Sequence, residues 1–140
     1  MTIDITPLEL VPLGRLEVVL DPPVLVLGGP SGTRAVYSVS SGTFEGRGIS
    51  ATVTGEDWVT VGAEGTGTLD VRLVLQTDDG ASILVTYQGR TDTTTPGASI
   101  YTAPRFETSD ERYVWLNRIQ AVAKGQLVES DLAYDLFELR

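Results

Sequence analysis

A turn between two strand-like runs constrains this chain more than any other feature. Residues 66–90 read TGTLDVRLVLQTDDGASILVTYQGR, with apolar and polar residues alternating on both sides of Asp78–Gly80. An Asp-Gly pair between two such runs is among the strongest short-range signals of a β-hairpin. The sequence therefore predicts two antiparallel strands joined by a tight turn.

The length of the turn decides which side chains share a face of this hairpin. A two-residue loop would place Arg72 opposite Tyr87, whereas the three-residue loop Asp78–Gly80 would place Arg72 opposite Thr86. Register is set chiefly by the face that must be buried. The three-residue loop separates apolar from polar residues more cleanly, and it puts Asp70 and Arg72 on the more polar face. Whether that face meets solvent, a partner subunit or a polar cavity stays open.

Short apolar or alternating runs, separated by glycine and proline, recur through the rest of the chain. No stretch of about 11 residues shows helical periodicity. Besides the hairpin, strands are expected at 8–20, 24–27, 33–39, 49–54, 58–62, 99–107, 118–123 and 131–138.

Glycine, proline and polar residues predict how these strands are joined or interrupted. Gly55-Glu56-Asp57 is expected to join two of them, and Pro104 predicts a break. The glycines within 40–48 predict a β-bulge or a close approach of two backbones. A short capped helical turn is expected to start at Ser109. About eight to ten short strands in sequential hairpins predict one all-β domain over residues 1–140, an antiparallel up-and-down β-barrel, because closure removes exposed strand edges.

Composition excludes several classes of function. The net charge of −9 has the wrong sign for binding nucleic acid or an anionic membrane surface. The chain has neither cysteine nor histidine, which excludes thiolate catalysis, serine–histidine triads and the commonest metal ligands. No membrane span or signal peptide is apparent. We expect a cytoplasmic protein without metal or cofactor, whose chemistry relies on Asp, Glu, Tyr, Arg, a single Lys, backbone groups or water.

Two pairs of opposite charge are the candidates for catalysis. Asp70 with Arg72, and Arg105 with Glu107, lie two residues apart and therefore share a face of a strand. A desolvated carboxylate moves protons near neutral pH when burial raises its pKa, and a guanidinium would hold negative charge. The simpler interpretation of each pair is an exposed ion pair, worth at most about 1 kcal/mol.

Aromatic and amide side chains are the candidates for substrate binding. Trp58 and Trp115 would line an apolar cavity, or would simply fill the core. Tyr87 would donate a proton to the substrate, or would be a core aromatic whose hydroxyl finds a partner. Asn117 would donate to a developing oxyanion, or would cap a turn. Neither the glycine-rich segment 28–32 nor the Asp-Asp-Gly turn has the spacing of a phosphate-binding or calcium-binding loop.

Five motifs occur in order along the chain: GTFEGRG, EDW, TLDVRLVLQTDDGASI, APRFET and RYVWLN. Together they resemble the bacterial domain-of-unknown-function family 3237, over nearly the whole chain. The resemblance implies a small β-barrel of lipocalin-like or allene-oxide-cyclase-like shape, which binds small apolar or aromatic molecules in its mouth or lumen. Related barrels include cyclases and dirigent-type proteins, which shape a reactive intermediate. The resemblance supplies no established catalytic residues.

Three hypotheses for function follow. The first is a cofactor-independent lyase, isomerase or cyclase that acts on a small apolar, oxygenated metabolite, with a natural-product cyclisation or dehydration as its sharpest form. The second is a non-catalytic ligand-binding or carrier barrel, which predicts a cavity lined by apolar side chains. The third is a structural protein that forms a homodimer or higher homo-oligomer through an apolar outer patch.

Overall fold

The computed structural model describes all of residues 1–140, and nearly all of its regular structure is β. The strands are β1 (Leu10–Leu20), β2 (Val24–Gly29), β3 (Gly32–Gly46), β4 (Ile49–Val61), β5 (Thr66–Thr77), β6 (Ser82–Asp92), β7 (Ile100–Thr102), β8 (Arg105–Glu107), β9 (Ala121–Val128) and β10 (Asp131–Leu139). One short 3₁₀ helix, η1, spans Val114–Arg118. None of its helical structure has the length and apolar character that a membrane-spanning helix requires.

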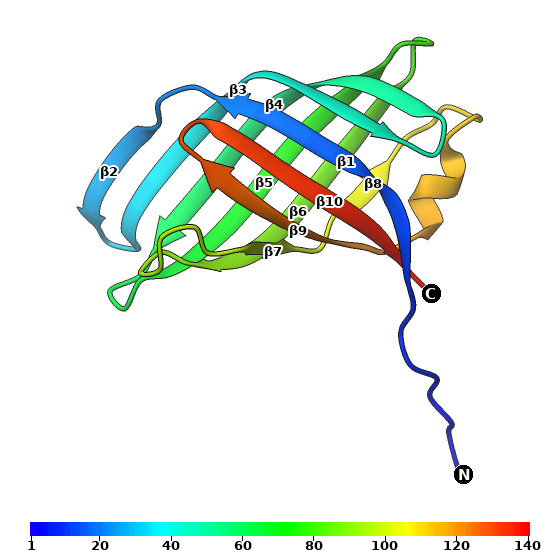
Figure 1. Ribbon diagram of the computed structural model, residues 1–140, viewed down its shortest axis with the longest axis horizontal. Coiled ribbons are helices and arrows are strands. Elements are labelled where there is room, and N and C mark those ends of the chain that lie inside the picture. The colour runs from blue at the N-terminus through cyan, green and yellow to red at the C-terminus, as the bar shows by residue number, and fades with distance from the viewer.

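Eight strands close into an antiparallel barrel (Figure 1). Their order is β1-β10-β9-β7-β6-β5-β4-β3, and β1 also pairs with β3, which completes the ring. β8 pairs only with β6, and β2 pairs only with β3. The predicted all-β barrel is confirmed, with β2 and β8 as additions to the closed ring.

β1 and β2 lie end to end along the same edge of β3. β1 pairs with residues 39–45 of β3, and β2 pairs with residues 32–36. The two strands are separated by Asp21-Pro22-Pro23, because proline has no N–H to give to a ladder and fixes its own φ. β2 flares away from the barrel, and its second edge has no neighbouring strand (Figure 1).

The central hairpin has the predicted register. Arg72 lies opposite Thr86, and Tyr87 lies opposite Val71, so the loop is Asp78–Gly80. Gly80 has a φ of 94°, the left-handed conformation that a three-residue hairpin loop requires. The apolar residues of both strands face the core, and the more polar face is the outer face of the barrel.

The strand β4 is continuous where the sequence predicts two strands. The connection expected at Gly55-Glu56-Asp57 is wrong, because β4 pairs with β5 without a break from Ala51 to Val61. A Cβ atom at position 55 would lie 2.2 Å from the carbonyl oxygen of Arg72. The glycine therefore serves the close approach of two strands, not a turn, and the alternation of β4 carries Asp57 into the barrel.

Two other predicted features are confirmed, and two elements begin later in the chain than expected. The register of β3 against β4 shifts between Ser38 and Thr43, which confirms the bulge. Pro104 separates β7 from β8 as predicted. The helical turn begins later than the expected Ser109, and the carboxylate of Asp110 accepts the backbone N–H of Arg112 at 3.0 Å. β9 begins at Ala121, three residues after the predicted start.

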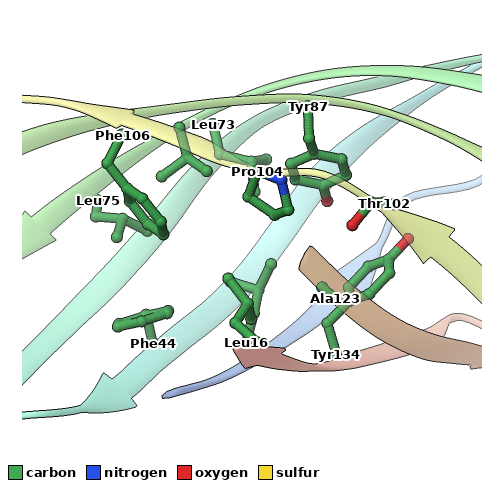
Figure 2. A pocket seen from close by; sticks show the side chains of 12 residues that line it. Leu16, Phe44, Leu73, Leu75, Tyr87, Thr102, Pro104, Phe106, Ala123 and Tyr134 are labelled. Carbon is green, nitrogen blue, oxygen red and sulfur yellow. The ribbon is translucent and has the colours of Figure 1, made fainter. Parts of the chain in front are cut away.

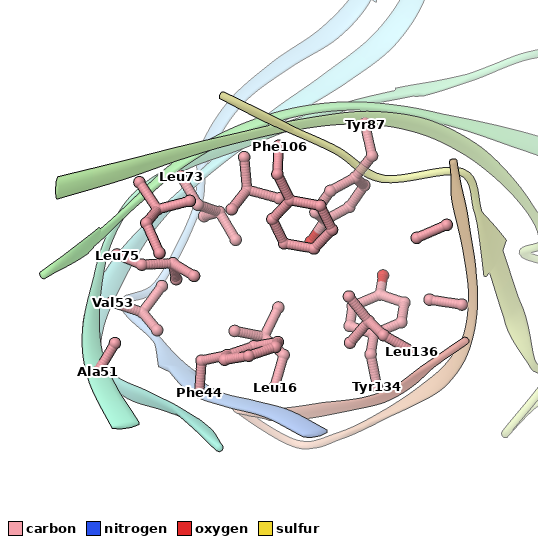
Figure 3. Packing of buried hydrophobic residues seen from close by; sticks show 14 of the residues in the cluster. Leu16, Phe44, Ala51, Val53, Leu73, Leu75, Tyr87, Phe106, Tyr134 and Leu136 are labelled. Atoms are coloured by element: carbon pink, nitrogen blue, oxygen red, sulfur yellow. The ribbon is translucent and has the colours of Figure 1, made fainter. Parts of the chain in front are cut away.

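One apolar core of 25 buried residues fills the barrel (Figure 3). Leu116 of η1 is fully buried, so η1 closes one end of the barrel. The hairpin turn contacts the segment that precedes η1, because Asp79 accepts a hydrogen bond from the Tyr113 hydroxyl and lies 3.1 Å from the guanidinium of Arg112. The opposite end, where β2 flares, has no such helix.

Candidate functional site

Four polar side chains reach the interior of the barrel among apolar neighbours. They are Asp57 on β4, Tyr87 on β6, Thr102 on β7 and Tyr134 on β10, each between 1% and 6% exposed. No protein group hydrogen-bonds to Asp57 Oδ1, Thr102 Oγ1 or the Tyr134 hydroxyl. A buried polar atom left unpaired costs about 1–3 kcal/mol, and few occur in native proteins. Three of them in one interior are therefore a candidate site for chemistry or for a polar ligand.

The register of the sheet brings these groups to one region. Asp57 lies opposite Val71, which lies opposite Tyr87, so that Asp57 and Tyr87 are two strand spacings apart, roughly 10 Å between backbones. The rings of Tyr87 and Tyr134 pack edge to face, with centroids 5.8 Å apart. Figure 2 shows the hydroxyls of Tyr87, Thr102 and Tyr134 pointing into the same interior space.

A glycine makes room for the ring of Tyr134. Gly125 of β9 lies directly opposite Tyr134 of β10. A Cβ atom at position 125 would lie 2.4 Å from Tyr134 Cδ1 and 2.4 Å from the carbonyl oxygen of Ala133. Any larger residue would therefore push the ring away, so Gly125 fixes where the Tyr134 hydroxyl lies.

Burial controls the protonation of this cluster. Desolvation raises the pKa of Asp57 from 3.8 to about 7, because the low-dielectric interior disfavours its charged form. Burial also raises the pKa of Tyr87, with smaller contributions from Tyr134 and Asp57. Burial first, and then the nearby Asp57, raise the pKa of Tyr134. Near neutral pH the carboxyl group of Asp57 is thus present in both protonation states, while both phenols stay protonated.

The interior beside this cluster is apolar and nearly filled. Its lining comes from β1, β3, β5–β10 and the β7–β8 connection, and consists of Leu16, Phe44, Leu73, Leu75, Val85, Tyr87, Thr102, Pro104, Phe106, Ala123, Tyr134 and Leu136 (Figure 2). The unfilled space is about 10 Å³, room for roughly one water molecule. Toward the end where β2 flares, Tyr37 and Val59 face inward but are only partly buried. This end is therefore the side from which a larger ligand would have to enter, by displacing side chains.

The two charged pairs that the sequence singles out lie elsewhere. Asp70, Arg72, Arg105 and Glu107 are all exposed on the outer face of the barrel. The first three line one outer hollow of about 580 Å³. Glu107, which lies opposite Leu84 of β6, is not part of its lining. None of the four takes part in an ion pair. The structure brings three of these residues together but not to the lumen, and their catalytic role stays a prediction.

The predicted substrate-binding residues divide between the interior and the surface. Only Tyr87 belongs to the interior cluster. Trp58 is 47% exposed on the outer face, and its indole N–H donates to Glu56 at 2.9 Å. Trp115 packs against the core beneath the guanidinium of Arg47, 5.8 Å from the ring centroid.

Asn117 has the role of a cap. Its side-chain oxygen accepts the backbone N–H of Thr108 at 2.9 Å, and its amide nitrogen donates to the Thr108 carbonyl at 2.8 Å. These two bonds use the side-chain oxygen and one of the two N–H groups of the amide. The arrangement agrees with the simpler of the two interpretations of this residue.

The sequence interpretation misses Asp57, Thr102 and Tyr134. A signal for Asp57 is present, since it falls in step with Val53 and Val59 in the apolar register of β4. No comparable local signal marks Thr102 or Tyr134, because their proximity depends on how distant strands pair around the ring.

Comparisons with known proteins agree with this fold and add a chemical clue. The family described as "Protein of unknown function (DUF3237)" matches residues 8–139. A β-barrel-like protein of Acinetobacter baumannii is similar, with a TM-score of 0.90 and 27% identity over 99% of this chain and all of that one. The structure of an enzyme from Penicillium herquei is similar with a TM-score of 0.75 and 29% identity, over 99% of this chain and all of that one.

One curated relative has a named activity. The hydroalkoxylation enzyme phnH of Penicillium herquei is 37% identical over 89 residues. That match covers 63% of this chain, and the chain spans about half, 54%, of the length of the relative.

Proposed function

The chain belongs to the DUF3237 family of proteins of unknown function, and from that premise we propose that its barrel is an enzyme that cyclises a small apolar metabolite by proton transfer. The reaction is the intramolecular addition of a substrate hydroxyl to a carbon–carbon double bond. The observation that carries the proposal is the buried carboxyl group of Asp57, whose Oδ1 has no protein partner and whose pKa is about 7.

Such an addition needs a proton donor for the alkene and an acceptor for the hydroxyl proton, and a single carboxyl group can serve as both. The carboxylic acid form of Asp57 gives its proton to one alkene carbon, and the substrate oxygen attacks the other. The π bond breaks while a C–H and a C–O bond form. The resulting carboxylate then takes the proton of the attacking hydroxyl, which restores Asp57. The reaction is redox-neutral, and all its atoms come from the substrate and the shuttled proton.

A carboxyl group with a pKa near the working pH suits both halves of this cycle. General acid–base catalysis is most efficient when the catalytic pKa lies close to the ambient pH, and it contributes about 10²–10⁴ to a rate. At pH 7 an Asp57 with a pKa of about 7 is present as acid and base in similar amounts. An exposed aspartate would hold a proton in only about one molecule in a thousand.

The neighbouring hydroxyls have the role of orienting the substrate. Tyr87 and Tyr134 stay protonated because burial raises the pKa of each. Their O–H groups, with that of Thr102, donate to or accept from the substrate oxygen and hold it near the alkene. The apolar walls keep the chain of the substrate folded, which lowers the entropic part of the barrier.

The relative named a hydroalkoxylation enzyme supports this reaction class, since hydroalkoxylation is the addition of an alcohol to a double bond. The similarity to the structure of an enzyme from the same fungus supports catalysis in general. The substrate class follows from the lining, in which ten of twelve residues are hydrophobic. We therefore expect an apolar molecule with few oxygen atoms, one of which is the nucleophile.

The probe 2-allylphenol tests this function in D₂O. The expected product is 2-methyl-2,3-dihydrobenzofuran with a single deuterium in its methyl group, detected by mass spectrometry. Asp57→Asn should lose at least about 100-fold in rate, the low end for a lost acid–base catalyst. Asp70→Asn tests the alternative site on the outer face, and an active site inside the barrel predicts that this variant keeps the rate. A carrier barrel would bind the probe, quench tyrosine fluorescence and release it unchanged.

A further inference from the structure

The strand β2 is apolar on both faces and free along one edge. Its side chains Val24, Leu25, Val26 and Leu27 are 69%, 54%, 55% and 74% exposed. The strand carries no charge or proline, although these are the usual means by which proteins protect a sheet edge. Because such an edge is a template for another strand, β2 is a candidate site for strand addition.

A second segment of the chain is also left without partners. Residues 1–8 make no hydrogen bond, and the first contact is the backbone pair between Glu9 and Arg140. Ile3 and Ile5 alternate with polar residues, as in a strand with one apolar face, and they are 69% and 88% exposed. We call residues 1–8 the arm. Its pattern and its exposure are those of a strand without a sheet.

The arm cannot reach β2 of its own chain. β1 and β2 run end to end along β3, so Leu10 and Val24 are separated by roughly 45 Å at about 3.3 Å per residue. The arm, fully extended, spans roughly 30 Å. Figure 1 shows the arm leaving the barrel at the end opposite to β2. The two unpaired segments can meet only between two copies of the chain.

We propose that the arm of one copy adds as a strand to the free edge of β2 in a second copy. The backbone groups of the arm supply the missing ladder hydrogen bonds, and its side chains supply specificity, as in other cases of strand addition. The contact joins two different segments, so two copies exchange arms reciprocally about a two-fold axis, or repeated copies close into a ring.

Charge fixes which face of the arm lies on which face of β2. Arg34 lies opposite Val26 on the outer face and forms no ion pair. Asp4 placed opposite Val26 of the partner lies two strands from this guanidinium, within reach of the long arginine side chain. The same register sets the arm's isoleucines beside Leu25 and Leu27 on the inner face. This single register therefore pairs the opposite charges on the outer face and the apolar side chains on the inner face.

Cysteine pairs test the contact directly, because the natural chain has no cysteine. Asp4→Cys and Val26→Cys are made as separate full-length proteins and mixed under mild oxidation. A disulfide between the two variants, with little between copies of Val26→Cys alone, is the expected result. Ser82→Cys, at an exposed position of β6, is the control and should not form a disulfide with Asp4→Cys. Val26→Cys proteins that cross-link among themselves as readily as in the mixture would overturn the proposal in favour of β2–β2 pairing.

Removal of residues 1–7 gives an independent readout by light scattering. The full chain should be an oligomer, and the shortened chain should be a monomer with an unchanged circular dichroism spectrum, because these residues make no hydrogen bond within the barrel. Val26→Lys should give a monomer as well. A full chain that is monomeric, or a shortened chain that keeps the oligomer, would contradict the proposal.

Discussion

Replacing Asp57 by asparagine should change how the stability of the protein depends on pH. The folded protein keeps a proton on Asp57 up to a pKa of about 7, whereas the unfolded chain releases it near 3.8. Between these two values the folded state binds more protons than the unfolded state. The contribution of Asp57 to the free energy of unfolding therefore falls as pH rises from about 4 to about 7, and this contribution no longer changes above that range.

The size of the effect follows from the difference between the two pKa values. They differ by about three units, and each unit corresponds to about 1.36 kcal/mol. The wild type should therefore lose up to about 4 kcal/mol of stability through Asp57 between acid and neutral pH. The asparagine side chain of the variant has no proton to release, so this loss should be absent.

Urea unfolding of both proteins across this pH range measures the effect. The difference in free energy of unfolding, variant minus wild type, should rise with pH by up to about 4 kcal/mol. Glu138 and Asp110, whose pKa values hydrogen bonds lower to about 2, lose their contributions toward acid pH. They do so in both proteins and cancel in the difference. A difference that stays flat from pH 4 to 8 would refute the account of Asp57 as a desolvated carboxyl group.

Three further substitutions follow from the same geometry. Tyr134→Phe removes a buried hydroxyl for which the structure shows no hydrogen bond of normal geometry, so thermal unfolding should show no clear loss of stability while turnover of the probe falls. A clear loss of stability would mean that the hydroxyl bonds to Tyr87, whose ring packs beside it. Gly125→Ala forces a Cβ against the ring of Tyr134 and the backbone, so it should lower the free energy of unfolding in urea by about 1–3 kcal/mol and lower the activity. A neutral result would show that the ring is free to move. Glu138→Gln should lower the melting temperature at pH 7, because hydrogen bonds from Arg140 and Arg47 stabilise the charged carboxylate. The difference in melting temperature should shrink as pH falls toward about 2, and a difference independent of pH would contradict a stabilising role of the charge.

The barrel and the hairpin register could be predicted because they rest on local pattern. Leu69, Val71, Leu73 and Leu75 alternate with mostly polar residues, and the three-residue loop sets them on the same face as Ile83, Val85 and Tyr87. The same alternation carries Asp70 and its neighbour Arg72 to the outside. A polar residue that falls out of step with the apolar face of its strand is therefore a poor candidate for a lumen site.

The interior site could be predicted only in part. Asp57 follows Gly55 and Glu56, a combination typical of a turn. The turn signal hides the alternation with Val53 that places Asp57 inside the barrel. Tyr134 depends on a glycine nine residues earlier in the chain, across a hairpin, and on an aromatic partner from β6. These residues come together only when the strands pair into a closed barrel, and no local sequence pattern specifies that pairing.

The rate of deuterated dihydrobenzofuran formation from 2-allylphenol by wild type, Asp57→Asn and Asp70→Asn is the most direct test of the proposed chemistry. The wild type and Asp70→Asn should form the product at similar rates that fall as pH rises through about 7, since the acid form of Asp57 starts the reaction. Asp57→Asn should be slower by at least about 100-fold. No conversion by the wild type, full activity of Asp57→Asn, or loss of activity only in Asp70→Asn would contradict an active site inside the barrel.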